Sequence, residues 1–349
     1  MRQGEPDFQV FHHDLYRAVG RGRWWVMEQQ PGPVNWAPWN PDPLSGMARL
    51  WAWETFAHDA EAVCYFRWRQ APFAQEQMHA GLLRPDSMPA PAYDEAAQAA
   101  HELAEMPDVS TARTDVAPVF DYASAWAWET QPQGRDFGYF RLAFESYRAL
   151  RRLGLNIDIL PPDCADLSRY KLLLAPGVAT LSQPFLNALA SCKGIALIGP
   201  RSNAKRSEFS IPVPLPPNLP GMTATVARVE SLPPALIVPL AIGGQFLHWR
   251  EKIKTTDRVI EATADGWPAL ICAQGIHYLA GWPDDAALAR LLTALCHKAG
   301  IETDPLPEGL RRRDTEMHRF LFNYNAFNVE WDGKIIPAAG VFLQKIPPH

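Results

Sequence analysis

Short apolar runs alternate with stretches of helical spacing over the first hundred residues, and this alternation constrains the fold more than any other feature. Apolar side chains recur at intervals of three and four over residues 8–19, which predicts an amphipathic helix that ends at Gly20. Such alternation favours an α/β fold with parallel strands and is compatible with the end of a (β/α)₈ barrel. The elements expected in this part are a helix over 6–20, a strand over 23–29, a helix over 45–60, a strand over 62–68 and a helix over 93–106.

A second alternating pattern follows residue 107, where the composition changes. It predicts a separate, doubly wound α/β domain. A proline-rich segment over 211–220 and a βα tail to about residue 300 complete this domain. Its expected elements are strands over 117–124, 156–162, 170–177 and 193–200, and a helix over 137–154.

The last part of the chain changes to a period of two around the turn sequence WDGK, which predicts antiparallel strands of a small β-sandwich. We therefore expect three domains: the last strands and helices of a barrel over 1–107, a doubly wound α/β domain over 108–305, and a small antiparallel β domain over 306–349.

Charge and cysteine content exclude several classes of protein. The net charge is −5, with 33 basic against 38 acidic residues, so no basic surplus favours a nucleic acid as partner. No apolar run reaches about 18 residues and the first residues contain no hydrophobic segment, so we expect neither a membrane span nor a signal peptide. The cysteines form no CxxC pair, which favours reduced thiols in a cytoplasmic protein over disulfides or a metal site, and no cofactor is expected. They are Cys64, Cys164, Cys192, Cys272 and Cys296.

Tryptophan is concentrated near the start of the chain. Of the 13 tryptophans, seven lie within the first 70 residues. An indole ring offers a flat apolar face and one N–H donor, so such a cluster beside acidic residues suits a sugar subsite, and it equally suits a tryptophan-rich core. The seven are Trp24, Trp25, Trp36, Trp39, Trp51, Trp53 and Trp68.

Glu28 is the first candidate for catalysis. It closes the apolar run WWVM at the end of an expected barrel strand, the place from which catalytic groups project in that fold. A carboxylate is rarely buried unless it is paired, so Glu28 faces either a cavity or a salt-bridge partner at the strand end.

Glu76 and His79 form a second candidate cluster, in the loop after the next expected strand. Together they have the groups to bind two neighbouring sugar hydroxyls. The Glu-x-x-His spacing also occurs in di-metal helices, but the further carboxylate-bearing helices of such a site are missing, so no metal is predicted. Acid–histidine groups elsewhere favour solvated helix faces: His12 and His13 with Asp14, and Glu54 with His58.

Several catalytic motifs are absent from the sequence. It contains no GxSxG, P-loop, GxGxxG or HExxH segment, which excludes the corresponding hydrolase, nucleotide-binding and zinc-protease mechanisms. Amidotransferase chemistry needs a cysteine in a tight strand-to-helix turn. After KLLLAPG the sequence continues VATLSQ, and Cys192 lies in a stretch with helical spacing instead.

The segments WVMEQQPGPVNWAP and GMARLWAWETFAHDAEAVCYFRWRQAPFAQEQMHAGLLRPD closely resemble the β-galactosidases of glycoside hydrolase family 42, over about residues 8–87. The remainder is similar to the family's trimerisation domain, which has a glutamine-amidotransferase-like fold, and then to its small C-terminal β domain. The resemblance implies that Glu28 is the nucleophile, that Trp36 lines the galactose site, and that Glu76 and His79 bind galactose hydroxyls. It also implies a galactoside substrate and a homotrimer.

The sequence departs from the family pattern in two places. The acid/base of the family is a glutamate in an Asn-Glu pair far upstream of the nucleophile, whereas 27 residues precede Glu28 here and Glu5, the one glutamate among them, lies in no such pair. Asp59 also stands where the resemblance leads us to expect glycine. We therefore expect the C-terminal portion of a retaining β-galactosidase, with two of the eight barrel strands and no acid/base. A non-catalytic trimeric assembly or sugar-binding remnant is the alternative.

Overall fold

Both ends of the sequence contribute to the first of two structural units. In the computed structural model, which describes residues 2–106, 109 and 111–347, the first unit comprises Met1–Arg113 and Pro305–His349, and the second is Thr114–Asp304. The expected division into three domains stays a prediction. A small C-terminal β domain that packs against the barrel part would fall into one compact unit with it, whether or not it is a separate domain.

The first unit begins with the helix–strand alternation that the sequence predicts. β1 and β2 pair in parallel, with Gln29 opposite Tyr65. The first helix ends at Val19 with Gly20 as its C-cap, and position 20 needs glycine because an added Cβ would lie 2.0 Å from the carbonyl oxygen of Arg23. The second strand begins and ends earlier than expected. The elements are α1 (Pro6–Val19), β1 (Trp24–Gln29), α2 (Met47–Ala57), β2 (Ala60–Tyr65) and α3 (Pro91–Glu105).

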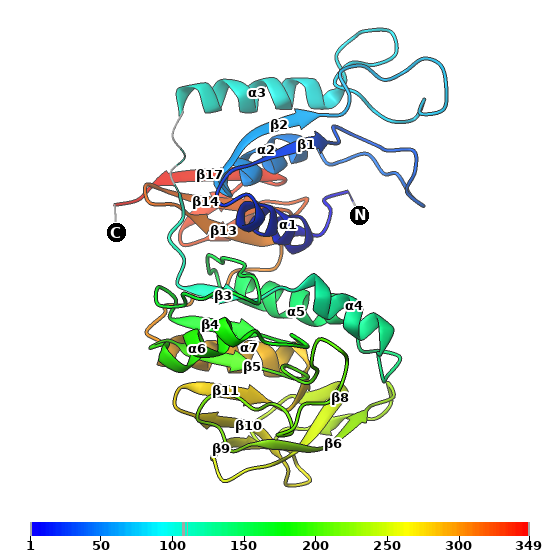
Figure 1. Ribbon diagram of the computed structural model, residues 1–349. Coiled ribbons are helices and arrows are strands. Elements are labelled where there is room, and N and C mark those ends of the chain that lie inside the picture. The colour runs from blue at the N-terminus through cyan, green and yellow to red at the C-terminus, as the bar shows by residue number, and fades with distance from the viewer. Residues whose placement is uncertain (1, 107–108, 110, 348–349) are drawn as a thin grey trace. The chain divides into compact units, whose positions relative to one another are not determined.

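The C-terminal strands pack against these early helices, and Figure 1 shows the red and orange strands beside the blue helices α1 and α2. Leu50 and Trp53 of α2 share a buried cluster with Phe320 and Phe322. As predicted for the segment around WDGK, every strand pair here is antiparallel. The strands are β13 (Leu310–Asp314), β14 (His318–Asn323), β15 (Val329–Trp331), β16 (Lys334–Ile336) and β17 (Gly340–Lys345).

The prediction of solvated helix faces is wrong at His13, Asp14, Glu54 and His58, since all four side chains are buried, whereas His12 is half-buried. Nδ1 of His58 lies 2.9 Å from Oδ1 of Asp14, and a guanidinium nitrogen of Arg313 lies 3.8 Å from the same oxygen. Glu54 accepts a hydrogen bond from the Tyr324 hydroxyl. Strands from the opposite end of the chain cover these helices, and local spacing carries no signal of such distant partners.

The second unit is built on a six-stranded sheet in the order β3-β4-β5-β11-β10-β9. The pairs from β3 to β11 are parallel, and β10 and β9 add an antiparallel edge. Its strands are β3 (Val116–Pro118), β4 (Leu172–Ala175), β5 (Ile195–Ile198), β9 (Arg258–Ala262), β10 (Pro268–Ala273) and β11 (Ile276–Leu279), and its helices are α4 (Tyr122–Thr130), α5 (Tyr139–Arg152), α6 (Gln183–Ser191) and α7 (Asp285–Lys298).

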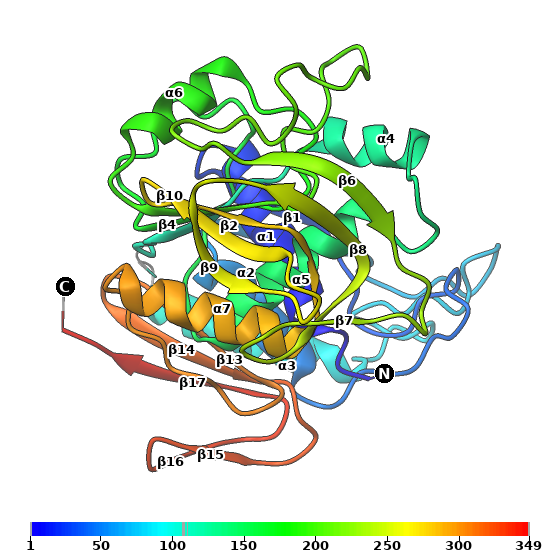
Figure 2. The same cartoon turned by 90° about the horizontal axis from the view of Figure 1, so that it is seen from below.

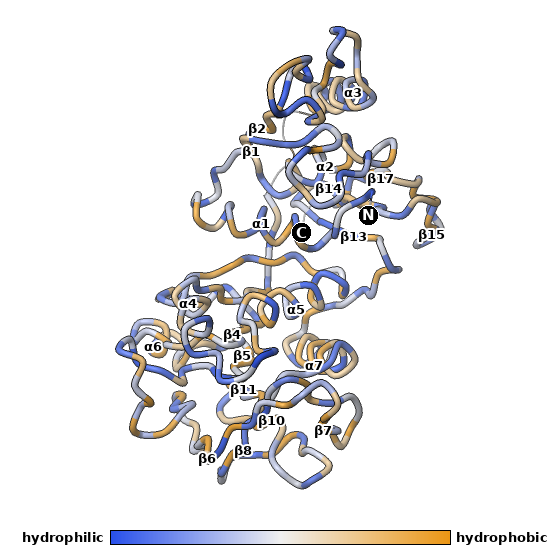
Figure 3. Tube along the Cα trace, turned by 90° about the vertical axis from the view of Figure 1, so that its right-hand side faces the viewer, coloured by the Kyte–Doolittle hydropathy of each residue, from blue (hydrophilic) through white to orange (hydrophobic). Residues whose placement is uncertain are grey.

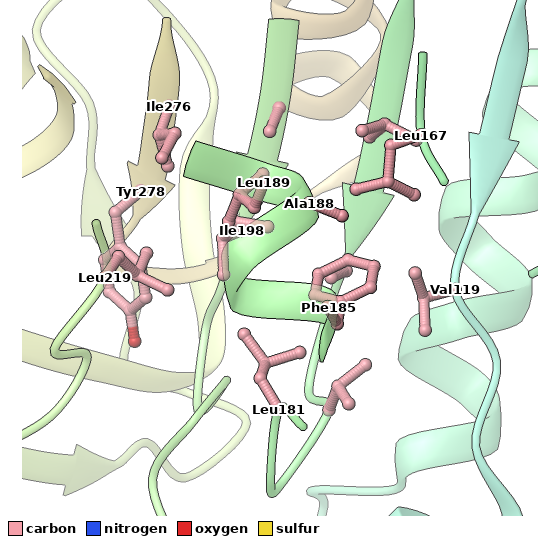
Figure 4. Packing of buried hydrophobic residues seen from close by; sticks show 14 of the residues in the cluster. Val119, Leu167, Leu181, Phe185, Ala188, Leu189, Ile198, Leu219, Ile276 and Tyr278 are labelled. Atoms are coloured by element: carbon pink, nitrogen blue, oxygen red, sulfur yellow. The ribbon is translucent and has the colours of Figure 1, made fainter. Parts of the chain in front are cut away.

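Helices cover both faces of this sheet. Alternate residues of a strand point to opposite sides, so these strands present side chains to helices on each face. On one face Phe185 and Leu189 of α6 pack with Ile198, as Figure 4 shows. On the other face Leu142 of α5 and Leu288 of α7 lie near Leu174, Leu197 and Leu279. Helix α7 is coloured mainly as hydrophobic in Figure 3, in keeping with its place against the sheet.

Two expectations for the second unit are wrong in detail. The segment 156–162 forms isolated bridges from Ile157 and Leu160 to the region of β3 rather than a regular strand. The expected βα tail contains instead a second, mainly antiparallel sheet, in which β6 and β8 lie side by side (Figure 2). Its strands are β6 (Thr225–Ser231), β7 (Val238–Pro239), β8 (Gln245–Lys254) and β12 (Gly281–Pro283).

Candidate active site

The candidate residues follow two neighbouring parallel strands of the first unit. Glu28 is the penultimate residue of β1, and the loop that carries Glu76 and His79 begins after β2. The backbone N–H of Phe66 donates to the carbonyl of Gln29 at 3.1 Å. Because carboxyl ends of parallel strands share one edge, Glu28 and the loop after β2 emerge at the same edge.

Glu28 is exposed, and its Oε1 accepts a hydrogen bond of 3.0 Å from Nε2 of Gln30. The sequence left open whether this carboxylate meets a cavity or an ion pair. No salt bridge to Glu28 is found among the described residues, and the amide of Gln30 holds one of its oxygens.

A backbone hydrogen bond joins the two loops at this edge. The N–H of Ala80 donates to the carbonyl of Pro33 at 2.8 Å. The approach needs glycine at position 32, since an added Cβ would lie 2.7 Å from the Cβ of Ala80. The loop after β1, which carries Trp36, and the loop after β2 are thereby held together.

His79 is 1% exposed, yet neither ring nitrogen has a hydrogen-bond partner among the described residues. Its ring packs edge-on against Phe66, with the centroids 4.9 Å apart. Leaving a buried polar group unsatisfied costs about 1–3 kcal/mol, so such groups are rare in folded proteins and call for a partner that the chain does not supply.

Glu76 is half-exposed and forms an ion pair with Arg67. The Arg67 guanidinium also lies over the Phe66 ring, 4.7 Å from its centroid. Arg67 and Phe66 therefore link Glu76 to His79. The sequence carries no signal for Phe66, whose role is visible only in the folded loop.

Trp36 is 69% exposed, and Trp39 of the same loop is 85% exposed. Trp24 and Trp53, by contrast, are buried. The core interpretation is confirmed for Trp24 and Trp53, while the sugar-subsite interpretation of the exposed rings on the loop after β1 stays a prediction.

Over residues 2–106, 109 and 111–347, no three His, Cys, Asp or Glu side chains are placed to hold a metal ion. Within the same part of the chain, none of the helices has the length and apolar character that crossing a bilayer requires.

Sequence profiles of two domains match the chain, one described as β-galactosidase over residues 1–106 and one as β-galactosidase trimerisation domain over residues 114–302. The chain belongs to glycoside hydrolase family 42. A family relative, the β-galactosidase BgaA of a Thermus species, is 51% identical over 338 residues, which are 94% of this chain and 52% of that protein. The β-galactosidase Bga of Halorubrum lacusprofundi is 36% identical over 341 residues, 89% of this chain and 49% of that protein.

Solved structures of family 42 agree with this assignment. The β-galactosidase from the psychrophilic Marinomonas ef1 has a TM-score of 0.94 and 41% identity, and the match covers 99% of this chain and 56% of that one. The polyextremophilic β-galactosidase from Halorubrum lacusprofundi has a TM-score of 0.90 and 33% identity, with 99% and 56% covered. The chain therefore spans about half the length of the relatives that it matches.

Proposed function

We propose that this chain is the C-terminal portion of a retaining β-galactosidase, which removes terminal β-D-galactose from β-D-galactosides. Family membership supports the activity, and buried His79 with two unpartnered ring nitrogens is the observation in this chain that carries the proposal. In it, Glu28 is the nucleophile, while Trp36, Glu76 and His79 bind galactose.

Each of the proposed residues has a separate part in the reaction. Retaining glycosidases use two carboxyl groups about 5–5.5 Å apart, one to attack the anomeric carbon and one to protonate the leaving oxygen. Glu28 has the exposure that an attack requires, and the Gln30 amide restricts its orientation. A neutral imidazole has one donor and one acceptor nitrogen, so His79 is equipped to bind sugar hydroxyls through both.

Arg67 has a positioning role in this proposal. Its ion pair fixes the Glu76 carboxylate, and its contact with Phe66 supports the ring against which His79 packs. The carboxylate then accepts a hydrogen bond from a galactose hydroxyl, a charge-assisted interaction that is stronger than one between neutral groups.

The finer architecture belongs to the same proposal. β1 and β2 would be the last two strands of a (β/α)₈ barrel, and Glu28 would lie at its C-terminal face, where catalytic groups of that fold gather. The second unit, with its amidotransferase-like fold, would assemble a homotrimer, in line with the trimerisation profile that matches residues 114–302. The cytoplasmic location expected from the cysteines stays a prediction.

The 349 residues alone should not hydrolyse galactosides, because no acid/base is identified in them and general acid catalysis contributes about 10²–10⁴-fold. The test compares nitrophenol release by this chain with release by a chimera, in which the part of the Thermus relative that precedes the aligned region is joined ahead of residue 1.

The chimera should turn over substrate, Glu28→Gln should remove nearly all turnover, and the exposed control Glu105→Gln should keep it. Glu28-dependent hydrolysis by the chain alone would contradict the missing acid/base. A chimera that binds galactose but shows no Glu28-dependent turnover would favour the non-catalytic, sugar-binding alternative.

A further inference from the structure

A cavity of about 310 Å³ lies in the second unit, where α7 covers the strands β9, β10 and β11. The residues that line it all fall between positions 242 and 298, well inside this unit. Most of the lining is apolar, and both the helix and the sheet contribute to it. The apolar residues are Ile242, Ile260, Leu270, Leu291, Ala294 and Leu295.

The register of the sheet brings polar groups together at one end of the cavity. Cys272 of β10 pairs with Arg258 of β9 on one side and with His277 of β11 on the other. Residues that are directly opposite one another in paired strands share a face of the sheet, so Arg258 and His277 lie in one row. Lys298, in the last turn of α7, reaches this row because its ammonium donates to Nε2 of His277 at 3.4 Å.

His277 holds the Lys298 ammonium without adding a charge of its own. The ring is buried, and its Nδ1 donates to the carbonyl oxygen of Gly275 at 3.2 Å. Burial and the nearby charge of Lys298 lower the pKa of His277 to about 4. At neutral pH the ring is therefore uncharged, and Nε2 has a lone pair with which to accept from the ammonium.

The other end of the cavity is electrically balanced. β9 has one extra residue, Ile260, between the residues that pair with Leu270 and Ile271 of β10. This bulge allows both Ile260 and Glu261 to line the cavity. Glu261 is buried and accepts hydrogen bonds of 2.9 and 3.0 Å from Nη2 of Arg290. The ion pair leaves neither residue with a free charge to offer a ligand.

Arg258 and Lys298, by contrast, form no ion pair within the part of the chain that the structure describes. Glu261 is the one acid among the lining residues, and Arg290 already neutralises it. The lining therefore has two uncompensated positive charges, both near His277. These charges favour an anionic group of a ligand at this end, and the remaining lining favours an apolar body.

We propose that this cavity binds an aliphatic monocarboxylate, with the carboxylate at Arg258 and Lys298 and the alkyl chain along α7. Hydrogen bonds between two charged groups are among the strongest that proteins form, so the cationic end sets the orientation. The helix residues of the lining extend from Arg290 to Lys298, over about 12 Å, which suits a medium-length chain such as that of octanoate. The proposal is independent of the galactosidase activity.

The test is equilibrium dialysis of the purified 349-residue chain against radiolabelled octanoate at neutral pH. Octan-1-ol keeps the apolar chain without the charge and acetate keeps the charge without the chain, so each should bind about tenfold more weakly or less. Lys298→Met and Arg258→Met each delete one charge but keep an unbranched side chain. Each should weaken octanoate binding about tenfold, because a charge-assisted hydrogen bond is lost.

Lys254→Met is the matched control, since Lys254 is an exposed lysine of the second unit that does not line the cavity, and it should leave the affinity unchanged. Ala294→Phe introduces a ring into the cavity from an exposed position of α7 and should abolish binding. Circular dichroism and sedimentation of each variant show whether its fold and oligomeric state match those of the wild type.

Three outcomes would overturn the proposal. The first is an absence of saturable octanoate binding to the wild type. The second is equal affinity of the wild type for octanoate and octan-1-ol, which would remove the role of the two cations. The third is octanoate binding that folded Lys298→Met, Arg258→Met and Ala294→Phe all retain, which would place the ligand on another apolar surface.

Discussion

Asp14 is the residue on which the interior of the first unit most depends. Burial by itself would raise the pKa of Asp14, but the charges of His58, Arg313 and Arg17 hold that pKa well below its usual range. A carboxyl whose folded-state pKa is depressed contributes stability above its unfolded-state pKa of about 3.9, and this contribution is lost as the pH falls through the folded-state pKa.

Asp14→Asn should therefore lower the free energy of unfolding of the first unit by about 3–5 kcal/mol at neutral pH, since it leaves buried charge without its counter-charge. Urea titrations at a series of pH values measure this, with exposed Asp42→Asn as the control. The difference in the free energy of unfolding between wild type and Asp14→Asn should become smaller below about pH 4. A difference that stays constant down to acid pH would contradict the account.

Arg67 offers a prediction for the proposed site. Arg67→Met deletes the ion pair with Glu76 and the guanidinium above Phe66 while keeping an unbranched side chain. In the chimera it should lower kcat/KM about tenfold or more, and Arg67→Lys should recover part of the loss because it restores the charge. Unchanged kcat/KM in Arg67→Met would show that Glu76 needs no positioning.

At the scale of elements, α2 joins the two ends of the chain in one core. Leu50 is fully buried in the cluster that contains Phe320 and Phe322, and Leu292 of α7 is fully buried in the second unit. Each Leu→Ala substitution should cost about 2–5 kcal/mol. Hydrogen exchange should show that Leu50→Ala reduces protection in the first unit, including β14. It should show that Leu292→Ala reduces protection in the second unit. Equal effects of Leu50→Ala on both units would contradict the division.

Some elements can be predicted from the sequence and others cannot. The apolar residues of β1 and α2 are consecutive or closely spaced in the sequence, so both elements can be predicted from it, although α2 is buried largely by strands from the other end of the chain. The segment 156–162 misleads because it is apolar and short but pairs only at Ile157 and Leu160. The pairing of β6 with β8 depends on both segments at once, so the spacing of apolar residues in either one does not predict it.

Some residues of the candidate site can likewise be predicted from the sequence, and others become visible only in the folded chain. Glu28 is visible from the sequence as an acid at a strand end, whereas the contact of Phe66 with His79 depends on the conformation of a loop. Asp59, the position where the resemblance leads us to expect glycine, has φ of +67°, which explains the preference for a residue without a side chain there. Its contacts with Arg17 and Arg313 exist only in the folded unit.

On the scale of the whole molecule, assembly gives the next prediction. The trimerisation profile covers residues 114–302, so the full chain should self-associate through the second unit. Analytical ultracentrifugation should find a species of three times the mass of one chain, and a fragment of residues 114–304 should form the same oligomer. A full chain that sediments as a monomer at high concentration would contradict the proposed homotrimer.

The most direct test of the proposed activity is to trap its covalent intermediate in the chimera. A 2-deoxy-2-fluoro-galactoside with a good leaving group slows the breakdown of a glycosyl-enzyme, so the sugar stays on the nucleophile and its position can be found by mass spectrometry of peptides. The account predicts one label, on Glu28, and none in Glu28→Gln. A label on another carboxylate, or equal labelling of Glu28→Gln, would contradict it.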